Sequence, residues 1–195
     1  MTADGVTAVA AVVGVLIAFL GLKTWREQLY GNKDHEIAWK YLEAVFKLRN
    51  AINHEVRNPA IFPGEIQSAV EEFYGKNKLD EEKQKNPKAD LLAVYSIRWK
   101  EVMKARKNLD NVIIHAEIWW GEKVVGLEKP INECLGTLFV NVKNYINPQK
   151  GMDLNWNDDV IYYEGDGSNN EFDQKLKSAV KKMEDFARPY LRKED

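Results

Sequence analysis

The chain has 195 residues, of which 45% are hydrophobic and 30% are charged, and its formal net charge is -2. These proportions are typical of a folded globular protein and exclude an intrinsically disordered chain. The near balance of charge gives no bulk attraction to nucleic acid or to an acidic partner. The single cysteine, Cys134, excludes an intramolecular disulfide and suits a reducing compartment.

Residues 5 to 22, GVTAVAAVVGVLIAFLGL, contain no charged residue. As a helix they would rise about 27 Å, close to the ~30 Å hydrocarbon core of a bilayer. Asp4 precedes the segment and no Lys or Arg does, so the start of the chain lacks the positive region of a signal peptide. We predict a retained transmembrane helix; a cleaved signal peptide and a buried core helix are the alternatives.

The charges that flank this segment predict its orientation. Lys23 and Arg26 follow it, and Asp4 precedes it. The positive-inside rule then leaves the N-terminus outside and the C-terminal domain in the cytoplasm, as in a single-pass protein of the inner (plasma) membrane. Residues 1–30 are the predicted transmembrane anchor with a juxtamembrane helix, and residues 31–195 are the predicted cytoplasmic domain.

Small side chains recur on one face of the predicted span. They are spaced by 4, 3, 4 and 3 residues and are Thr7, Ala11, Gly14, Ala18 and Gly21. In lipid, small residues allow two helix backbones to approach closely, so this seam predicts self-association and a homo-oligomer. The alternative is that the pattern reflects the general abundance of Ala and Gly in membrane spans.

Hydrophobic periodicity after the span predicts an all-α fold. Gly31 and Asn32 are expected to break the first helix. Further helices are expected over residues 34–58, 64–74, 89–120, 130–146 and 170–188, with a lysine-rich linker over 75–88 and a short strand over 159–165. Helices joined by short or medium connections predict an antiparallel helical bundle.

Arg49, Asn50 and His54 lie within the stretch LRNAINHEV, residues 48–56. Their spacing resembles the motif of HEPN ribonucleases, which are all-helical. The resemblance implies that Arg49 binds phosphate and that His54 acts as acid and base on RNA, at a composite site of two subunits. On a regular α-helix, however, Arg49 and His54 point about 140° apart. A solvated arginine and a surface histidine are the alternative.

Basic residues gather on the helix expected over 89–120. They are Arg98, Lys100, Lys104, Arg106 and Lys107. They predict a surface for an anionic small ligand, a nucleotide or lipid headgroups, although basic helices are also commonly solvated. Seven acids between residues 151 and 174 do not have the spacing of an EF-hand, and the motifs that hold nucleotides or metals are missing from the sequence, so neither a metal nor a cofactor is predicted.

Three stretches, LKTWREQLYG, LRNAINHEVRNP and DFARPYLRK, together with the N-terminal span, resemble a family of small bacterial inner-membrane proteins of uncertain function. The layout is also similar, by analogy, to single-span effectors of phage defence. These features favour a membrane-anchored, self-associating binding protein, acting as a stress or phage-defence effector that senses an anionic ligand or a protein partner. The competing class is an enzyme, the HEPN-type ribonuclease, and only that alternative requires nucleic acid.

Overall fold

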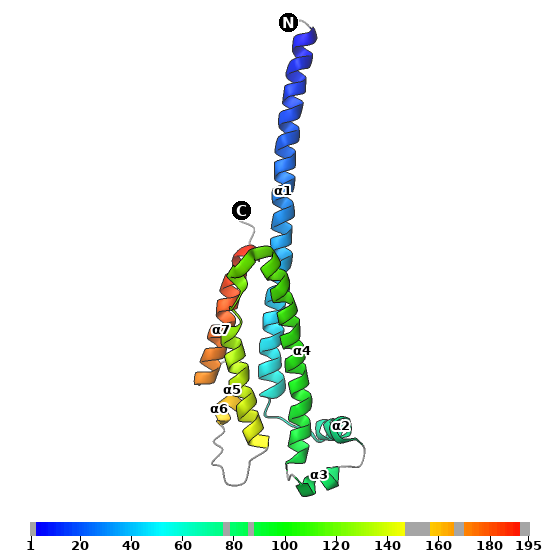
Figure 1. The fold of residues 1–195 in the computed structure, drawn as a ribbon, viewed down its shortest axis with the longest axis vertical. Helices are drawn as coiled ribbons and strands as arrows, with labels where there is room; N and C mark the ends of the chain where they lie inside the picture. Colours follow the sequence, from blue (N-terminus) through cyan, green and yellow to red (C-terminus); the bar gives the residue numbers. More distant parts are fainter. Residues whose placement is uncertain (1–2, 76–78, 86–87, 147–156, 166–169, 192–195) are drawn as a thin grey trace.

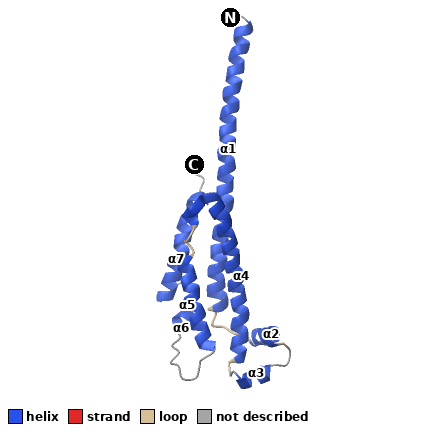
Figure 2. Cartoon of the chain, in the orientation of Figure 1, coloured by secondary structure: helices blue, strands red, loops and turns tan. Residues whose placement is uncertain are grey.

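The computed structural model describes residues 3–75, 79–85, 88–146, 157–165 and 170–191, with side chains from residue 13 onward except at 79, 84 and 85. The described chain is all-α, and Figure 2 shows helices and loops but no strand in this part. The helical elements in chain order are α1 (Ala3–Asn50), the π-helix η1 (Ala51–Val56), α2 (Pro63–Tyr74), α3 (Leu79–Lys85), α4 (Ala89–Trp120), the 3-10 helix η2 (Gly121–Val124), α5 (Lys129–Ile146), α6 (Asp158–Ile161), α7 (Glu171–Ala187) and the 3-10 helix η3 (Arg188–Leu191).

The lower half of α1 forms a bundle with three other helices. It packs on α4 on one side and on α7 on the other, and α5 completes the bundle against α7 and α4 (Figure 1). Leu48, Ile52, Leu109, Leu138 and Met183 are fully buried in the core between these helices. The short helix α2 lies outside the bundle and packs on α4 through a second, smaller apolar cluster. The predicted antiparallel helical bundle is therefore confirmed.

The expected break at Gly31 and Asn32 is wrong, because α1 continues through both residues for 48 residues in all. A glycine inside a helix costs about 1 kcal/mol relative to alanine, which neighbouring interactions can offset. Just beyond it, Glu36 accepts hydrogen bonds from Lys40 and Lys33 at 2.6 and 3.0 Å. These bonds, with the two positive charges, lower the pKa of Glu36 to about 2. The predicted domain boundary between residues 30 and 31 thus lies within one continuous helix.

Most predicted helix ends agree with the structure. Gly121, at φ 72°, ends α4 in a backbone conformation that favours glycine. The side chain of Asn170 accepts a hydrogen bond from the Asp173 amide and begins α7. The linker prediction missed α3. The strand expected over residues 159–165 is wrong, because Asn157 caps a short helix, α6, in its place.

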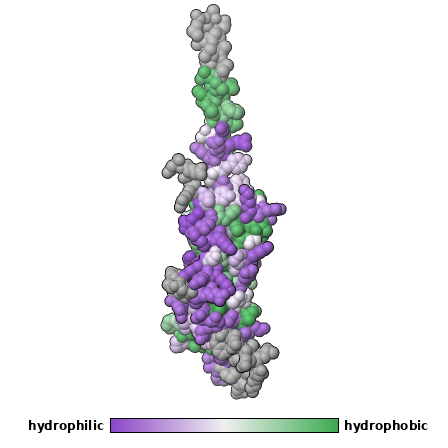
Figure 3. Space-filling model, turned by 90° about the vertical axis from the view of Figure 1, so that its left-hand side faces the viewer, coloured by the Kyte–Doolittle hydropathy of each residue, from purple (hydrophilic) through white to green (hydrophobic). Residues whose placement is uncertain are grey.

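The N-terminal part of α1, about two thirds of its 48 residues, projects beyond the bundle as a stalk, which we define as residues 3–33 (Figure 1). All described side chains from Val13 to Lys33 are exposed within this chain. Figure 3 shows a hydrophobic band on the upper part of this region, with more hydrophilic residues between the band and the bundle. The structure therefore leaves a long apolar surface that the chain does not cover.

Among the residues that the structure describes, no helix combines the length and the apolar character needed to cross a membrane. The side chains of residues 5–12, which form the first part of the predicted span, lie outside those described.

Candidate functional site

Arg57, which follows the π-helix η1, is fully buried at the end of the bundle away from the stalk. Its guanidinium donates five hydrogen bonds, to Val160 O (2.8 Å), Asn53 Oδ1 (3.1 Å), Asp173 Oδ1 (2.5 Å), Asp159 O (2.8 Å) and Tyr162 O (3.0 Å). It also lies over the ring of Phe172, at 4.6 Å from the centroid. Arg57 therefore joins the end of the first helix to α6 and α7.

The partner carboxylate of Arg57 is buried as well. Asp173 in the first turn of α7 is 2% exposed, and its Oδ2 has no hydrogen-bond partner among the described atoms. The guanidinium of Arg57 and the carboxylate of Asp173 carry opposite charges, so the buried pair has no net charge. A buried ion pair of this kind is specific to its geometry, since either charge alone would be costly to bury.

The π-helix changes the relation between Arg49 and His54. Its i→i+5 hydrogen bonds, such as the bond from Arg57 N to Ile52 O at 3.1 Å, widen the turn. Each residue then advances by a smaller angle than in an α-helix. The two side chains therefore lie closer to a common face than the α-helical spacing predicts.

A pocket of about 330 Å³ opens beside this turn. Arg49 and Tyr163 both line it, and the exposed His54 ring packs against Tyr163 at 5.4 Å between centroids. The Arg49 guanidinium donates to Asn50 Oδ1 at 3.1 and 3.2 Å. Of the three residues of the HEPN-like motif, only Arg49 lines this pocket; Asn50 bonds to Arg49, and His54 packs on Tyr163 at its edge.

The five basic residues of α4 do not form one surface. Lys100, Lys104 and Lys107 are exposed and fall on one face, while Arg106 pairs with Asp110. Lys100 contacts Glu72 at 2.6 Å, and Lys104 contacts Glu101 at 3.5 Å.

Arg98 has a different position from the other four, because it is only 6% exposed. It donates to both Glu65 oxygens at 2.6 and 2.9 Å, and to the carbonyls of Asn58 and Ala60 at 2.6 and 2.7 Å. These bonds fasten α2 and the preceding loop to α4. As a correction to the sequence-based surface, Arg98 is a structural residue that does not face solution.

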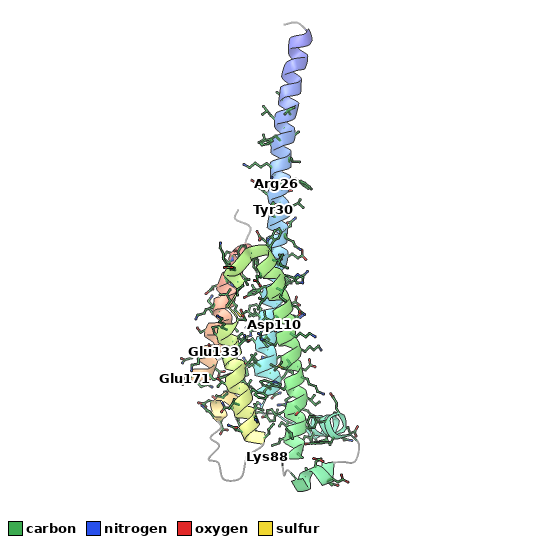
Figure 4. All side chains as sticks on the ribbon, in the orientation of Figure 1. Arg26, Tyr30, Lys88, Asp110, Glu133 and Glu171 are labelled. Atoms are coloured by element: carbon green, nitrogen blue, oxygen red, sulfur yellow. The ribbon has the colours of Figure 1, made fainter. Side chains whose placement is uncertain are left out.

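The base of the stalk is held by two tryptophans at the end of α4. Trp119 and Trp120 both donate their indole N–H to Asp34 Oδ1, at 2.7 and 2.8 Å. Tyr30 lies against Trp119, with 5.7 Å between ring centroids. Figure 4 labels Arg26 and Tyr30 just above the point where α1 meets the bundle. These contacts fix the direction in which the stalk leaves the bundle.

The opposite side of the same segment is open. A groove of about 1130 Å³ runs along α1 there, with Gln28, Asn32 and Trp39 on the helix side and Pro189 and Tyr190 of η3 on the other. Within the seam of small residues, Gly14, Ala18 and Gly21 are exposed, whereas the side chains of Thr7 and Ala11 lie outside those described.

The structural roles of Arg57, Asp173 and Asp34 were not predicted from the sequence. Arg57 lies in the stretch LRNAINHEVRNP and Asp173 is one of the seven acids after residue 151, but their long-range partners, like those of Asp34, are 85 to 116 residues away along the chain. The only local signal is an arginine directly before Asn58-Pro59, at the end of an apolar helix.

The chain matches no protein-family model, no curated protein and no solved structure. The fold and the described contacts define a class only: an all-α protein in which a helical bundle carries a long, projecting N-terminal helix with an exposed apolar surface.

Proposed function

We propose that this protein is a membrane-anchored, self-associating helical binding protein, with the bundle on the cytoplasmic side. The observation that carries the proposal is the exposed apolar stalk. Seven large apolar side chains between residues 13 and 22 are 48–68% exposed within the chain: Val13, Val15, Leu16, Ile17, Phe19, Leu20 and Leu22.

Burial of one large apolar side chain is worth about 1.5–3 kcal/mol, so leaving seven of them in water costs on the order of 10 kcal/mol. Insertion into lipid would bury these side chains, which no other described part of the chain covers, and would remove this cost. The charge-free stretch from residue 5 to residue 22 and the basic residues directly after it support the same placement.

We expect the full chain to sediment with membranes and to remain there after alkaline carbonate washing. The double substitution Leu16→Arg and Leu20→Arg should release most of it into the soluble fraction, because a charge near the centre of a span costs roughly 2.5–3.5 kcal/mol. Phe62→Arg is the control, since Phe62 is 66% exposed but lies far from the stalk. A wild-type chain found in the soluble fraction would contradict the anchor.

Self-association through the seam is tested by Gly14→Leu. A Cβ at Gly14 meets no atom of this chain within 4 Å, so the added side chain has room in a single copy. A loss of oligomer, measured as mass in mild detergent, would therefore report on a neighbouring helix. We expect Gly14→Leu to shift the protein to the monomer and Val15→Leu, off the seam, to leave the mass unchanged. An unchanged mass in Gly14→Leu would remove the seam.

The ligand of this binding protein, under the same proposal, is anionic and contacts the exposed face of α4. Lys100, Lys104 and Lys107 fall within an arc of about 60° on the helix. Their two carboxylate partners, Glu72 and Glu101, are themselves more than half exposed, so these ion pairs are weak and exchangeable. The role in stress or phage defence rests on analogy of layout alone.

A HEPN-type ribonuclease is the second candidate, and the π-helix is the observation that favours it. The widened turn reduces the angle between Arg49 and His54, and His54 packs on Tyr163, which lines a pocket together with Arg49. Under this candidate, His54→Ala should abolish cleavage of single-stranded RNA by the purified protein and leave its oligomeric mass unchanged. Lys47→Ala, at an exposed residue outside that pocket, should retain cleavage. Cleavage that survives His54→Ala excludes the site.

A further inference from the structure

The open face of α1 continues the seam of small residues beyond the predicted membrane segment. Stepping by 4 and 3 residues from Gly14 gives one stripe, all exposed: Gly14, Ala18, Gly21, Trp25, Gln28, Asn32, His35 and Trp39. We call it the outer stripe. Gly21 and Trp39 are 18 residues apart, which is five full turns, so the stripe stays on one face of the helix.

The outer stripe lies opposite the face that α1 turns toward its own bundle. Tyr30 and Asp34 contact α4, and Ile37 and Tyr41 enter the core. At the same level Trp39 is 61% exposed and lines the groove of about 1130 Å³ together with Gln28 and Asn32. The chain therefore fills one face of this helix and leaves the other open.

Charges are mostly kept off the outer stripe. Between residues 23 and 40 the helix carries seven charged residues, and six of them lie about 90° or more from the stripe axis. The seventh, Glu36, is 18 residues from Ala18 and therefore lies at the same angle, at the edge of the stripe, where it pairs with Lys33 and Lys40. The next two steps of the stripe, Leu42 and Phe46, are buried and half-buried, so the open stripe ends at Trp39. A uniformly solvated helix face would carry more charge over these five turns.

The polar residues in the stripe indicate what covers it. Gln28 and Asn32 have side-chain amides that carry both a donor and an acceptor, so each can pair with the same residue of an identical helix. Such polar residues at a or d positions fix register in parallel coiled coils. Two copies anchored in one membrane would enter from the same side, which makes their α1 helices parallel.

We propose that the outer stripe is a parallel coiled-coil interface with α1 of a second copy of this chain, extending from the membrane segment to Trp39. This inference rests on the proposed self-association and adds its extent, register and partner. The groove beside η3 then receives the neighbouring helix, and identical residues of the two copies meet along the stripe.

Disulfide trapping in the full-length protein tests the interface. Two Cα atoms must lie within about 4.4–6.8 Å to form a disulfide, which identical core positions of a parallel pair satisfy and flank positions do not. In a Cys134→Ala background we expect Asn32→Cys and Trp39→Cys to give cross-linked dimers in membranes under mild oxidation, at least tenfold faster than the control Lys33→Cys. Lys33 is next to Asn32 and is also exposed, but lies about 100° round the helix.

Gly14→Cys, measured in parallel, separates this proposal from the one on which it rests. Cross-linking at Gly14 but not at Asn32 or Trp39 overturns the extended interface and keeps the membrane seam. Cross-linking at none of the three positions overturns both. Equal cross-linking rates for Asn32→Cys and Lys33→Cys would show that two copies of α1 collide without a fixed helix face between them. That result also overturns the interface. Cross-linking at Asn32 and Trp39 but not at Gly14 overturns the seam and an interface that begins in the membrane segment.

Discussion

Arg57→Ala should lower the free energy of unfolding by about 3–5 kcal/mol, the usual cost of removing one partner of a buried ion pair. Asp173 would remain as a buried charge, and the carbonyls of Val160 and Tyr162 would lose the Arg57 donor. The Asp159 carbonyl would lose it too but would keep its bond from Asn170 Nδ2 at 3.3 Å. Chemical denaturation of the full chain in detergent, followed by circular dichroism, measures the difference. Since native stabilities are about 5–15 kcal/mol, this loss is a large fraction of the total stability.

Arg49→Ala is the matched control for Arg57→Ala. Arg49 lies two turns earlier, near the end of α1. Its guanidinium donates hydrogen bonds only to the neighbouring Asn50 among the described residues, and it lies over the Phe46 ring at 4.9 Å from the centroid. We expect its effect to be within about 0.5 kcal/mol, as for most surface substitutions. Arg57→Lys should recover little, because one ammonium group cannot replace five N–H donors in a planar arrangement. Equal stability of Arg57→Ala and wild type would contradict the structural role assigned to this arginine.

Arg98→Ala should be the second most damaging substitution, at about 2–3 kcal/mol. Its guanidinium makes charge-assisted bonds to Glu65 and to two carbonyls of the loop before α2. The expected loss is smaller than for Arg57, because Glu65 is 32% exposed and water can solvate it when its partner is gone. The same denaturation experiment measures it.

Limited proteolysis adds a local measurement for Arg98→Ala. The loop from Asn58 to Phe62 should be cut faster than in wild type, because two of its carbonyls no longer bond to α4. Lys100→Ala is the control, since the Lys100–Glu72 pair is exposed on both sides and surface pairs contribute at most about 1 kcal/mol. A normal cleavage rate in Arg98→Ala would show that the loop is held by other contacts.

Local patterns predicted the elements that depend on local chemistry. The ends of α4 at residues 89 and 120 follow from apolar periodicity and from Gly121, and the start of α7 follows from the Asn170 cap. The predicted break at Gly31 was wrong because a single glycine disfavours a helix only weakly. Asp34, three residues later, is held to α4 by Trp119, 85 residues away along the chain, and local sequence does not contain this contact. The stretch DVIYYEG has strand-like composition. Arg57 donates hydrogen bonds to three carbonyls within it, those of Asp159, Val160 and Tyr162, and holds it in another conformation.

The candidate site was predictable only in part. Basic residues on α4 can be counted from the sequence, but their burial cannot, because Arg98 becomes structural only when Glu65 of α2 folds back against it. The relation of Arg49 to His54 depends on a π-turn that α-helical periodicity does not contain. Burial and helix register are properties of the whole packed bundle.

The continuity of α1 has a mechanical consequence. A 48-residue helix is about 72 Å long, and a single helix without a hinge transmits rotation as well as displacement. Asp34 clamps it to Trp119 and Trp120 about two thirds of the way along, and the π-helix η1 at its lower end leads to Arg57, which contacts α6 and α7. A twist applied to the stalk would therefore act as a torque on the far end of the bundle, so that the two ends of this protein move as parts of one lever.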